Sequence, residues 1–138
     1  MKITKLTILY VHNIRTDSSQ VGQRPILVRI DTDSGVYGVG EVGLAYGAGG
    51  NAAVGILKDY APYIIGMDPM NTEAIWEKLF KTTFWGQGGG TVIFGGMSAI
   101  DMALWDIKGK VFGVPVYQLL GGKCRDSMRT YASQIQLA

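Results

Sequence analysis

The sequence predicts an α+β domain in which a three-stranded antiparallel meander is followed by a helical bundle. Residues 1–42 hold three short runs of alternating polar and apolar side chains separated by turns, which is typical of half-buried strands. From about residue 51 to residue 112, apolar side chains recur at intervals of three and four, which is typical of helices packed on one side. Because the strands precede the helices, an antiparallel sheet covered on one face fits better than a parallel sheet of βαβ units.

The three strands are expected over residues 1–11, 25–31 and 36–42. Apolar side chains alternate along the first two runs, so one face of each strand should turn to the core. The residues on that face are Leu6, Ile8, Tyr10, Ile26, Val28 and Ile30. Asp33-Ser34-Gly35 is expected to form the turn between the last two strands, because glycine adopts a positive φ without strain.

Two helices are expected between the sheet and residue 82. The first should begin near Asn51 and end at Gly66, with Pro62 kinking it or tightening its last turn. The second should begin with Asp68 as N-cap and Pro69 in the first helical position. Their buried faces are predicted to be Val54, Leu57, Ala61 and Ile64, then Ile75, Trp76, Leu79 and Phe80.

A long third helix is predicted to end at Gly113, because glycine takes the left-handed conformation that closes a helix. Its apolar stripe is Ile93, Met97, Ile100, Leu104, Ile107 and Val111. Ala99 and Ala103 keep part of it thin, so that a neighbouring element can approach closely. Asp106 lies four residues before Lys110, a favourable pair on an exposed helix face. Pro115 should start a short fourth helix.

Composition and charge exclude several classes of protein. With 138 residues the chain has the length of about one domain. A net charge of +2 without a Lys/Arg cluster does not indicate a nucleic-acid partner. No run approaches the roughly 18 apolar residues of a membrane span, and no signal peptide is evident. The single cysteine, Cys124, forms no intrachain disulfide and suits a reducing compartment, so we expect a cytoplasmic protein.

The motifs that usually carry chemistry have structural interpretations in this sequence. Residues 38–43 match Gly-x-Gly-x-x-Gly, but they lie within a predicted strand of a meander, so close packing is favoured over dinucleotide binding. His12 is the only histidine and has no partner at ligand spacing, so no metal site is expected. Asp101 and Asp106 lie on different faces of one helix and cannot act as a facing carboxylate pair. We therefore expect no catalytic or metal-binding residue in this chain.

Residues 98–122 carry a resemblance to a known family. Asp-Met-Ala-Leu-Trp-Asp-Ile-Lys-Gly-Lys at 101–110, followed by Gly-Val-Pro-Val-Tyr-Gln-Leu-Leu-Gly-Gly at 113–122, closely resembles the end of the N-terminal capping domain of the enolase superfamily, in its mandelate racemase and muconate-lactonising branch. The glycine-rich segments after Glu41 and after Thr83 look most like those of acid-sugar dehydratases of the galactonate and mannonate type.

The resemblance implies a domain organisation and an activity. Residues 1–122 would be the capping domain, and residues 123–138 a linker and the first strand, from Met128, of a (β/α)8 barrel that is otherwise absent. The full-length enzyme would be a Mg²⁺-dependent lyase that abstracts the proton α to a carboxylate and eliminates water. Its Mg²⁺ ligands and bases would lie in the barrel, its substrate would be an acid sugar, and it would form a homo-oligomer. The 138-residue chain alone would be inactive.

Substrate contact is expected in the loops, because the family's first two capping loops fold over the barrel mouth. The candidate substrate-binding residues are Ser18, Ser19, Gln20, Tyr46 and Trp85. The fold leaves the reaction open, since a racemase or a cycloisomerase can use the same scaffold. A non-catalytic binding domain, or a domain that only mediates oligomerisation, would also fit the sequence.

Overall fold

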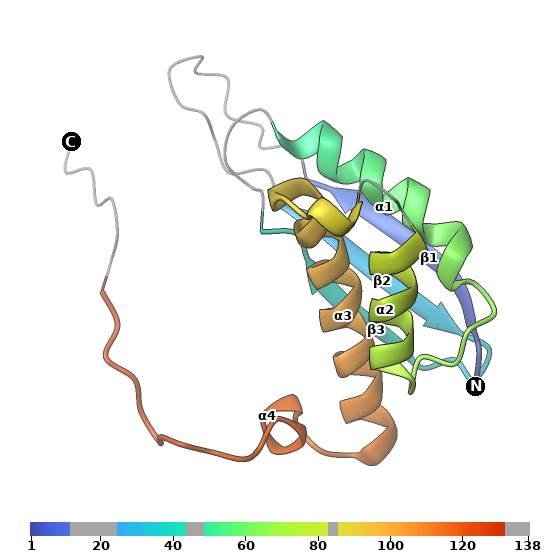
Figure 1. Cartoon of the computed structure of the whole chain (residues 1–138). Coiled ribbons are helices and arrows are strands. Elements are labelled where there is room, and N and C mark those ends of the chain that lie inside the picture. Colours follow the sequence, from blue (N-terminus) through green and yellow to red (C-terminus); the bar gives the residue numbers. More distant parts are fainter. Residues whose placement is uncertain (12–24, 44–48, 83–85, 132–138) are drawn as a thin grey trace.

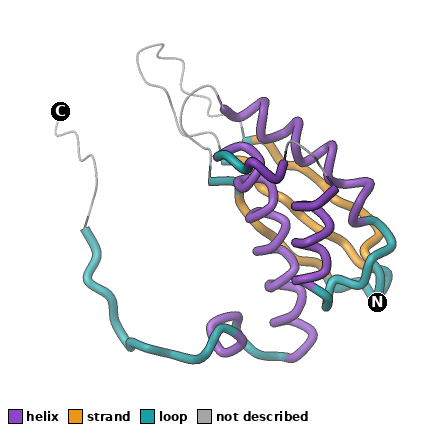
Figure 2. The backbone as a smooth tube through the Cα atoms, viewed as in Figure 1, coloured by secondary structure: helices purple, strands orange, loops and turns teal. Residues whose placement is uncertain are grey.

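The computed structural model describes residues 1–11, 25–43, 49–82 and 86–131. Within them, three strands form one sheet, and the helices α1, α2 and α3 pack on one of its faces (Figure 1). Figure 2 shows the same two layers, and also a C-terminal segment that leaves them. The predicted α+β class, with strands first and helices afterwards, is confirmed.

The sheet is the predicted meander. β1 (Ile3–Tyr10), β2 (Ile26–Thr32) and β3 (Tyr37–Glu41) pair in the order β1-β2-β3, and both pairs are antiparallel. Gly35 lies in the turn between β2 and β3 with a φ of 80°, a conformation that favours glycine. Because β1 and β3 are both antiparallel to β2, they run in the same direction.

The predicted core face of the sheet is also confirmed. Ile26, Val28 and Ile30 are fully buried, and the predicted residues of β1 are partly buried against them. Ile3 joins this core although it lies three positions before Leu6. The register of β1 against β2 shifts between Ile3 and Lys5, and this irregularity turns Ile3 to the same face as Leu6.

Helix α3 (Thr91–Phe112) lies directly on β3. A Cβ atom at Gly38 would overlap the carbonyl oxygen of Ala103, and one at Gly40 would overlap that of Ala99. The small residues predicted to thin the helix therefore face the two glycines of the strand, and the backbones meet. This contact confirms the packing interpretation of the glycine motif.

Helix α1 (Gly50–Ile64) packs with a face slightly rotated from the prediction. Leu57 and Ile64 are fully buried as expected, but Ala53 and Tyr60 are buried with them, whereas Val54 and Ala61 lie at the margin. Tyr60 is fully buried and lies at the centre of the buried face. The apolar pattern did not include it, because tyrosine carries a polar hydroxyl. Helix α2 (Thr72–Thr82) buries Ile75 and Leu79 and partly buries Trp76 and Phe80, as predicted.

The predicted start of α2 is wrong by one turn. Asp68 and Pro69 precede the helix, where the Asp68 Oδ1 atom accepts a hydrogen bond from the Met70 N–H at 3.0 Å. The Asp68 carbonyl oxygen accepts a second bond from the Asn71 N–H at 3.1 Å. An aspartate that bonds two residues ahead closes a turn of its own, and the helix begins only after it.

Glycine ends α3 as predicted, and a short helix follows. Gly113 is left-handed, with a φ of 67°, and its N–H bonds back to the last turn of α3. Pro115 precedes α4 (Val116–Leu119) as its N-cap. The prediction that Val111 belongs to the core is wrong, since it is 43% exposed. The helix has passed the end of the sheet at this point, because the preceding residue, Lys110, already reaches the first residue of β3.

The described residues after α4, 120–131, form no helix or strand. Residues 123–131 are exposed, and Met128 and Tyr131 are 77% and 88% exposed. The barrel strand predicted from Met128 is therefore not formed over 128–131, and the rest of it lies outside the described residues. A strand is held by hydrogen bonds to a neighbouring strand, and the described sheet gives this segment no such neighbour.

Candidate functional site

Two strands end and two helices begin at the same edge of the sheet, which we call the loop edge. Tyr10 and Glu41, the last residues of β1 and β3, lie there because the two strands run in the same direction. The Val11 N–H donates to the Pro25 carbonyl oxygen at 3.0 Å, so the two described residues that flank 12–24 are joined. A Cβ atom at Gly50 would overlap the Tyr10 hydroxyl, so the start of α1 packs directly on the end of β1.

Helix α3 also begins at the loop edge, and two glycines shape its start. Gly89 and Gly90 have φ values of 70° and 96°, which L-residues with side chains rarely adopt. A Cβ atom at Gly89 would also overlap the Phe94 ring. The Phe94 N–H then donates to the Gly90 carbonyl oxygen at 3.0 Å, the first helical bond. The backbone conformation at the start of α3 therefore requires glycine at positions 89 and 90.

Aromatic stacking fixes the first turn of α3 against α2. The Phe94 ring lies 6.5 Å from the Trp76 ring and 6.4 Å from the Phe80 ring, with interplanar angles of 9° and 14°. Trp76 and Phe80 are four residues apart on α2 and so share one face. Phe94 is still 39% exposed, so one side of its ring remains available at the surface.

A groove of about 560 Å³ lies between the end of β3 and the start of α3. It is lined by Glu41, Gly43, Gly90, Thr91, Phe94, Gly95, Ser98 and Met102. Residues 91, 95, 98 and 102 are spaced by four, three and four, so they form a second stripe on α3 beside the core stripe. This stripe was not predicted from the sequence because its members are small or mixed in character, and its spacing was the signal that could have revealed it.

The chemistry of the groove suits contact with a ligand or a covering element more than catalysis. Its lining carries one carboxylate, Glu41, and two hydroxyls, Thr91 and Ser98. Glu41 is exposed. Among the described residues, no group of three or more His, Cys, Asp or Glu side chains could hold a metal ion. We therefore assign no metal ligand within the described residues.

The five predicted substrate-binding residues lie outside the described residues. Ser18, Ser19 and Gln20 fall in the sequence between Val11 and Pro25, Tyr46 between Gly43 and Gly49, and Trp85 between Thr82 and Gly86. The structure therefore does not test their roles. It does place Val11, Pro25 and Gly43, which flank two of these segments, at or next to the loop edge.

One carboxylate on α3 has an altered acidity. Desolvation raises the pKa of Asp101 above its ordinary value, and the charge of Glu73 on α2 raises it further. A hydrogen bond from Trp105 and the charge of Lys108 act in the opposite direction. Lys108 in turn donates to the Thr72 hydroxyl at 3.2 Å, so these charges bridge α2 and α3. The arrangement is a contact between two helices, consistent with the structural role expected for Asp101.

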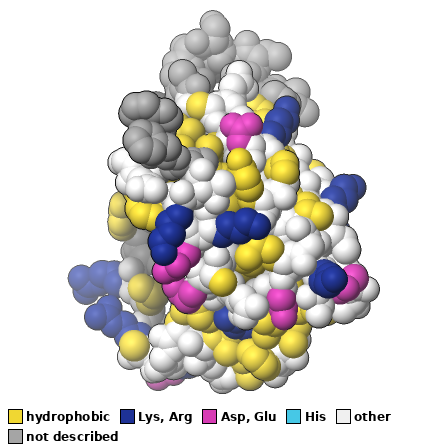
Figure 3. Space-filling view, turned by 45° about the vertical axis from the view of Figure 1, so that its right-hand side comes forward, with side chains coloured by type: hydrophobic (Ala, Val, Ile, Leu, Met, Phe, Trp, Pro, Cys, Tyr) yellow, Lys and Arg dark blue, Asp and Glu magenta, His cyan; other side chains and the backbone are white. Residues whose placement is uncertain are grey.

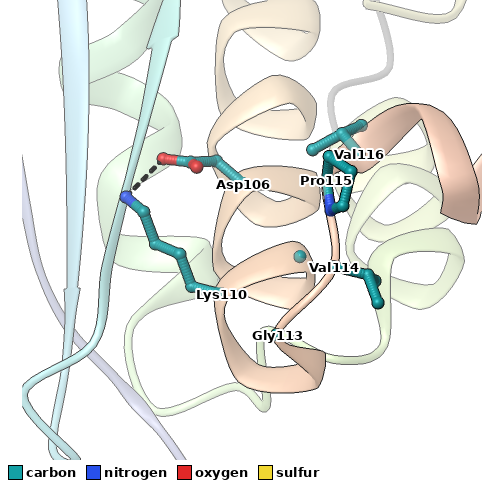
Figure 4. Close-up of a pocket in the computed structure, with 7 residues that line it drawn as sticks. Asp106, Lys110, Gly113, Val114, Pro115 and Val116 are labelled. Carbon is teal, nitrogen blue, oxygen red and sulfur yellow. Dashed lines mark hydrogen bonds and ion pairs between the residues drawn. The ribbon is translucent and has the colours of Figure 1, made fainter.

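A smaller cleft of about 320 Å³ lies at the other end of α3, beside α4 (Figure 4). Its lining includes Asp106 and Lys110, whose carboxylate and ammonium groups are 2.7 Å apart. The figure shows both side chains reaching toward β3, with Pro115 and Val116 on the other side of α3. This cleft lies at the end of α3 away from the loop edge and from the residues that flank 12–24 and 44–48, so we do not assign the site to it.

The surface carries charges of both signs. In the face shown in Figure 3, basic and acidic side chains alternate with hydrophobic ones, and no large patch of one sign forms. This distribution agrees with the net charge of +2. Over the residues that the structure describes, the helices are too short or too polar to cross a bilayer.

Comparisons with known proteins identify relatives of the chain. Residues 8–121 match the family model described as mandelate racemase / muconate lactonizing enzyme, N-terminal domain. The chain is 43% identical over 131 residues to D-galactonate dehydratase of Verminephrobacter eiseniae, an alignment that covers 95% of this chain and 31% of the relative. The chain thus spans about a third of the length of this curated relative.

Two solved structures have the same fold over nearly all of the chain. The crystal structure of a candidate dehydratase from Zymomonas mobilis ZM4 superposes with a TM-score of 0.89 at 67% identity, covering 98% of this chain and 33% of that one. An enolase from Pantoea ananatis, solved with bound D-gluconate and Mg, gives a TM-score of 0.75 at 37% identity, covering 90% of this chain and 28% of that one.

Proposed function

Since the chain belongs to the mandelate racemase / muconate lactonizing enzyme family and matches its N-terminal domain, we propose that it is the capping, specificity-determining domain of an acid-sugar dehydratase. The observation that carries the proposal is the loop edge, where the residues flanking 12–24 and 44–48 meet beside the groove on α3. The 43% identity to a D-galactonate dehydratase supports the substrate class.

In this proposal the chain supplies substrate selection. The two loops cover the opening of a barrel formed by the rest of the protein, and Ser18, Ser19, Gln20, Tyr46 and Trp85 contact the end of the substrate away from its carboxylate. Hydroxyl and amide groups suit the several hydroxyls of an aldonate, because each can donate and accept a hydrogen bond. Residues 1–122 form the cap, and residues 123–138 form the linker and, once the other barrel strands are present to pair with it, the first barrel strand.

The reaction is β-elimination of water. The proton on the carbon next to the carboxylate is removed, and the hydroxyl on the following carbon leaves as water. The resulting enol then becomes a 2-keto-3-deoxy acid. We propose that the bases and the Mg²⁺ ligands lie outside this chain, in the barrel. The Mg and D-gluconate bound in the Pantoea ananatis enolase support this cofactor and this class of substrate.

The proposal is tested with the full-length protein. D-galactonate, D-mannonate and D-gluconate are each incubated with the enzyme and Mg²⁺, and the 2-keto-3-deoxy product is measured as its semicarbazone. We expect turnover of at least one acid sugar, and its loss when EDTA removes the metal. Failure with a broad panel of acid sugars, or exchange of the α-proton for solvent deuterium without loss of water, would reject the dehydratase proposal. Exchange alone would favour a racemase.

A further inference from the structure

The open edge of β3 exposes a defined set of backbone groups. β3 is the last strand in the order β1-β2-β3 of the described sheet. The Val36 carbonyl oxygen and the Val42 N–H both bond to β2, at 3.2 and 2.9 Å. Because bonding alternates along an antiparallel strand, the N–H and C=O groups of Tyr37, Val39 and Glu41 point away from β2. A strand edge of this kind can pair with a strand of another molecule.

Two side chains of α3 occupy part of this edge. The Asp106 Oδ2 atom accepts a hydrogen bond from the Val39 N–H at 2.9 Å, and Lys110 Nζ donates to the Tyr37 carbonyl oxygen at 2.8 Å. The two side chains also bond to each other at 2.7 Å, as the dashed line in Figure 4 shows. The close contact of β3 with α3 at Gly38 lets these side chains reach the strand.

The ring of Tyr37 keeps the lysine over the edge. Lys110 Nζ lies 4.4 Å from the ring centroid, and the guanidinium carbon of Arg29 lies 3.9 Å from it. Cation–π attraction of this kind holds an ammonium group near an aromatic face. Arg29 is itself paired with Asp31 at 2.7 Å, so it does not compete for Asp106.

We propose that Asp106 and Lys110 form an edge lock, which prevents β3 from pairing with β3 of a second copy of this chain. The lock satisfies outward-pointing groups of Tyr37 and Val39, and it places a charged lysine where an incoming strand would lie. Natural sheets protect their edges with charged side chains, lysine above all. Beyond the lock, the edge at Glu41 borders the groove, so at most a very short stretch remains for pairing. This inference is independent of the proposed dehydratase activity.

Hydrogen exchange of the full-length protein tests the lock directly. In Asp106→Ala the Val39 amide loses its acceptor, and its exchange should accelerate by about 10- to 100-fold, the effect of losing a charge-assisted hydrogen bond. The matched control is Glu77→Ala, which breaks another i,i+4 pair with Lys81, at 2.8 Å, that contacts no strand. The control should leave the Val39 amide unchanged.

Self-association provides the decisive readout. Sedimentation velocity over a concentration series should show Asp106→Ala and Lys110→Met forming larger species than the wild type and Glu77→Ala, with an increase in thioflavin fluorescence. Lys110→Met keeps the length of the side chain and serves if Asp106→Ala fails to fold by circular dichroism. Unchanged association of a folded Lys110→Met variant would overturn the proposal, even if the Val39 amide of Asp106→Ala exchanged faster, because the pair would then be only a structural contact.

Discussion

Replacing Gly40 by alanine should separate the sheet from its central helix. The added Cβ atom would overlap the Ala99 carbonyl oxygen and lie 2.9 Å from the Ala99 carbonyl carbon and 3.2 Å from the Ala103 nitrogen. These are backbone atoms of α3, so no side-chain rotation relieves the overlap. Overpacking costs typically about 1–3 kcal/mol. We expect a loss of about 3 kcal/mol here, at the upper end of that range, because two backbone elements must move apart.

The assay is guanidinium denaturation followed by tryptophan fluorescence and circular dichroism. Gly43→Ala is the matched control next to the same strand, since no atom lies within 4 Å of its Cβ position and its φ is not positive. Gly55→Ala, inside α1 and equally unobstructed, should stabilise the domain by about 0.5–1 kcal/mol through helix propensity. If Gly40→Ala lost less than about 1 kcal/mol, the lower end of the overpacking range, the close contact of β3 with α3 would not be a constraint, and the reasoning would be wrong.

Four further outcomes are expected. The folded-state pKa of Asp101 is raised, chiefly by desolvation and also by the charge of Glu73. Ionisation of Asp101 therefore opposes folding, so the free energy of unfolding is highest while Asp101 is protonated at low pH and falls as the pH rises through the folded-state pKa. Asp101→Asn should therefore raise Tm at neutral pH, and this gain should disappear below the ordinary aspartate pKa. An equal rise in Tm at neutral pH and at low pH would show that ionisation of Asp101 is not the cause. Gly113→Ala should lower stability by about 1 kcal/mol, measured by thermal melting, because the left-handed position at a φ of 67° disfavours a Cβ. In the full-length enzyme, Tyr46→Ala should raise KM or shift the preferred acid sugar without changing Mg²⁺ affinity; altered metal binding with unchanged kcat/KM would refute the loop proposal. The 138-residue chain alone should not dehydrate any acid sugar in the semicarbazide assay, with or without Mg²⁺, and measurable turnover would contradict the placement of the bases.

The sequence was most informative where one residue type has few structural uses. The alternation of Ile26, Val28 and Ile30 leaves one plausible buried face, and the structure confirms it. Gly113 follows the end of an apolar stripe, and glycine tolerates a positive φ, so the end of the helix at this residue was also predictable. In both cases the local pattern and the tertiary structure favour the same arrangement.

The errors arose where tertiary contacts decide between similar local options. Asp68 can cap a helix or close a turn of its own, and only the structure shows that it closes a turn. Val111 continues an apolar stripe, but the sheet that would bury it ends one residue earlier. The spacing of the second stripe on α3 is visible in the sequence, but how far β3 extends along that stripe, and so which part of it borders the groove, depends on tertiary packing. The second contact of Asp106, to the strand, was missed for the same reason.

The position of α3 in the chain sets the timing of folding during synthesis. Its residues cover β3 and β2 and contact α1 and α2, so the apolar face of the sheet has no central helix until Phe112 has been made. About 70 residues separate the end of β3 from that point. At typical translation rates the ribosome takes about 4–14 s to add them. During this interval the nascent sheet exposes Val28 and Ile30, and the chain is therefore expected to depend on chaperones that shield emerging hydrophobic segments.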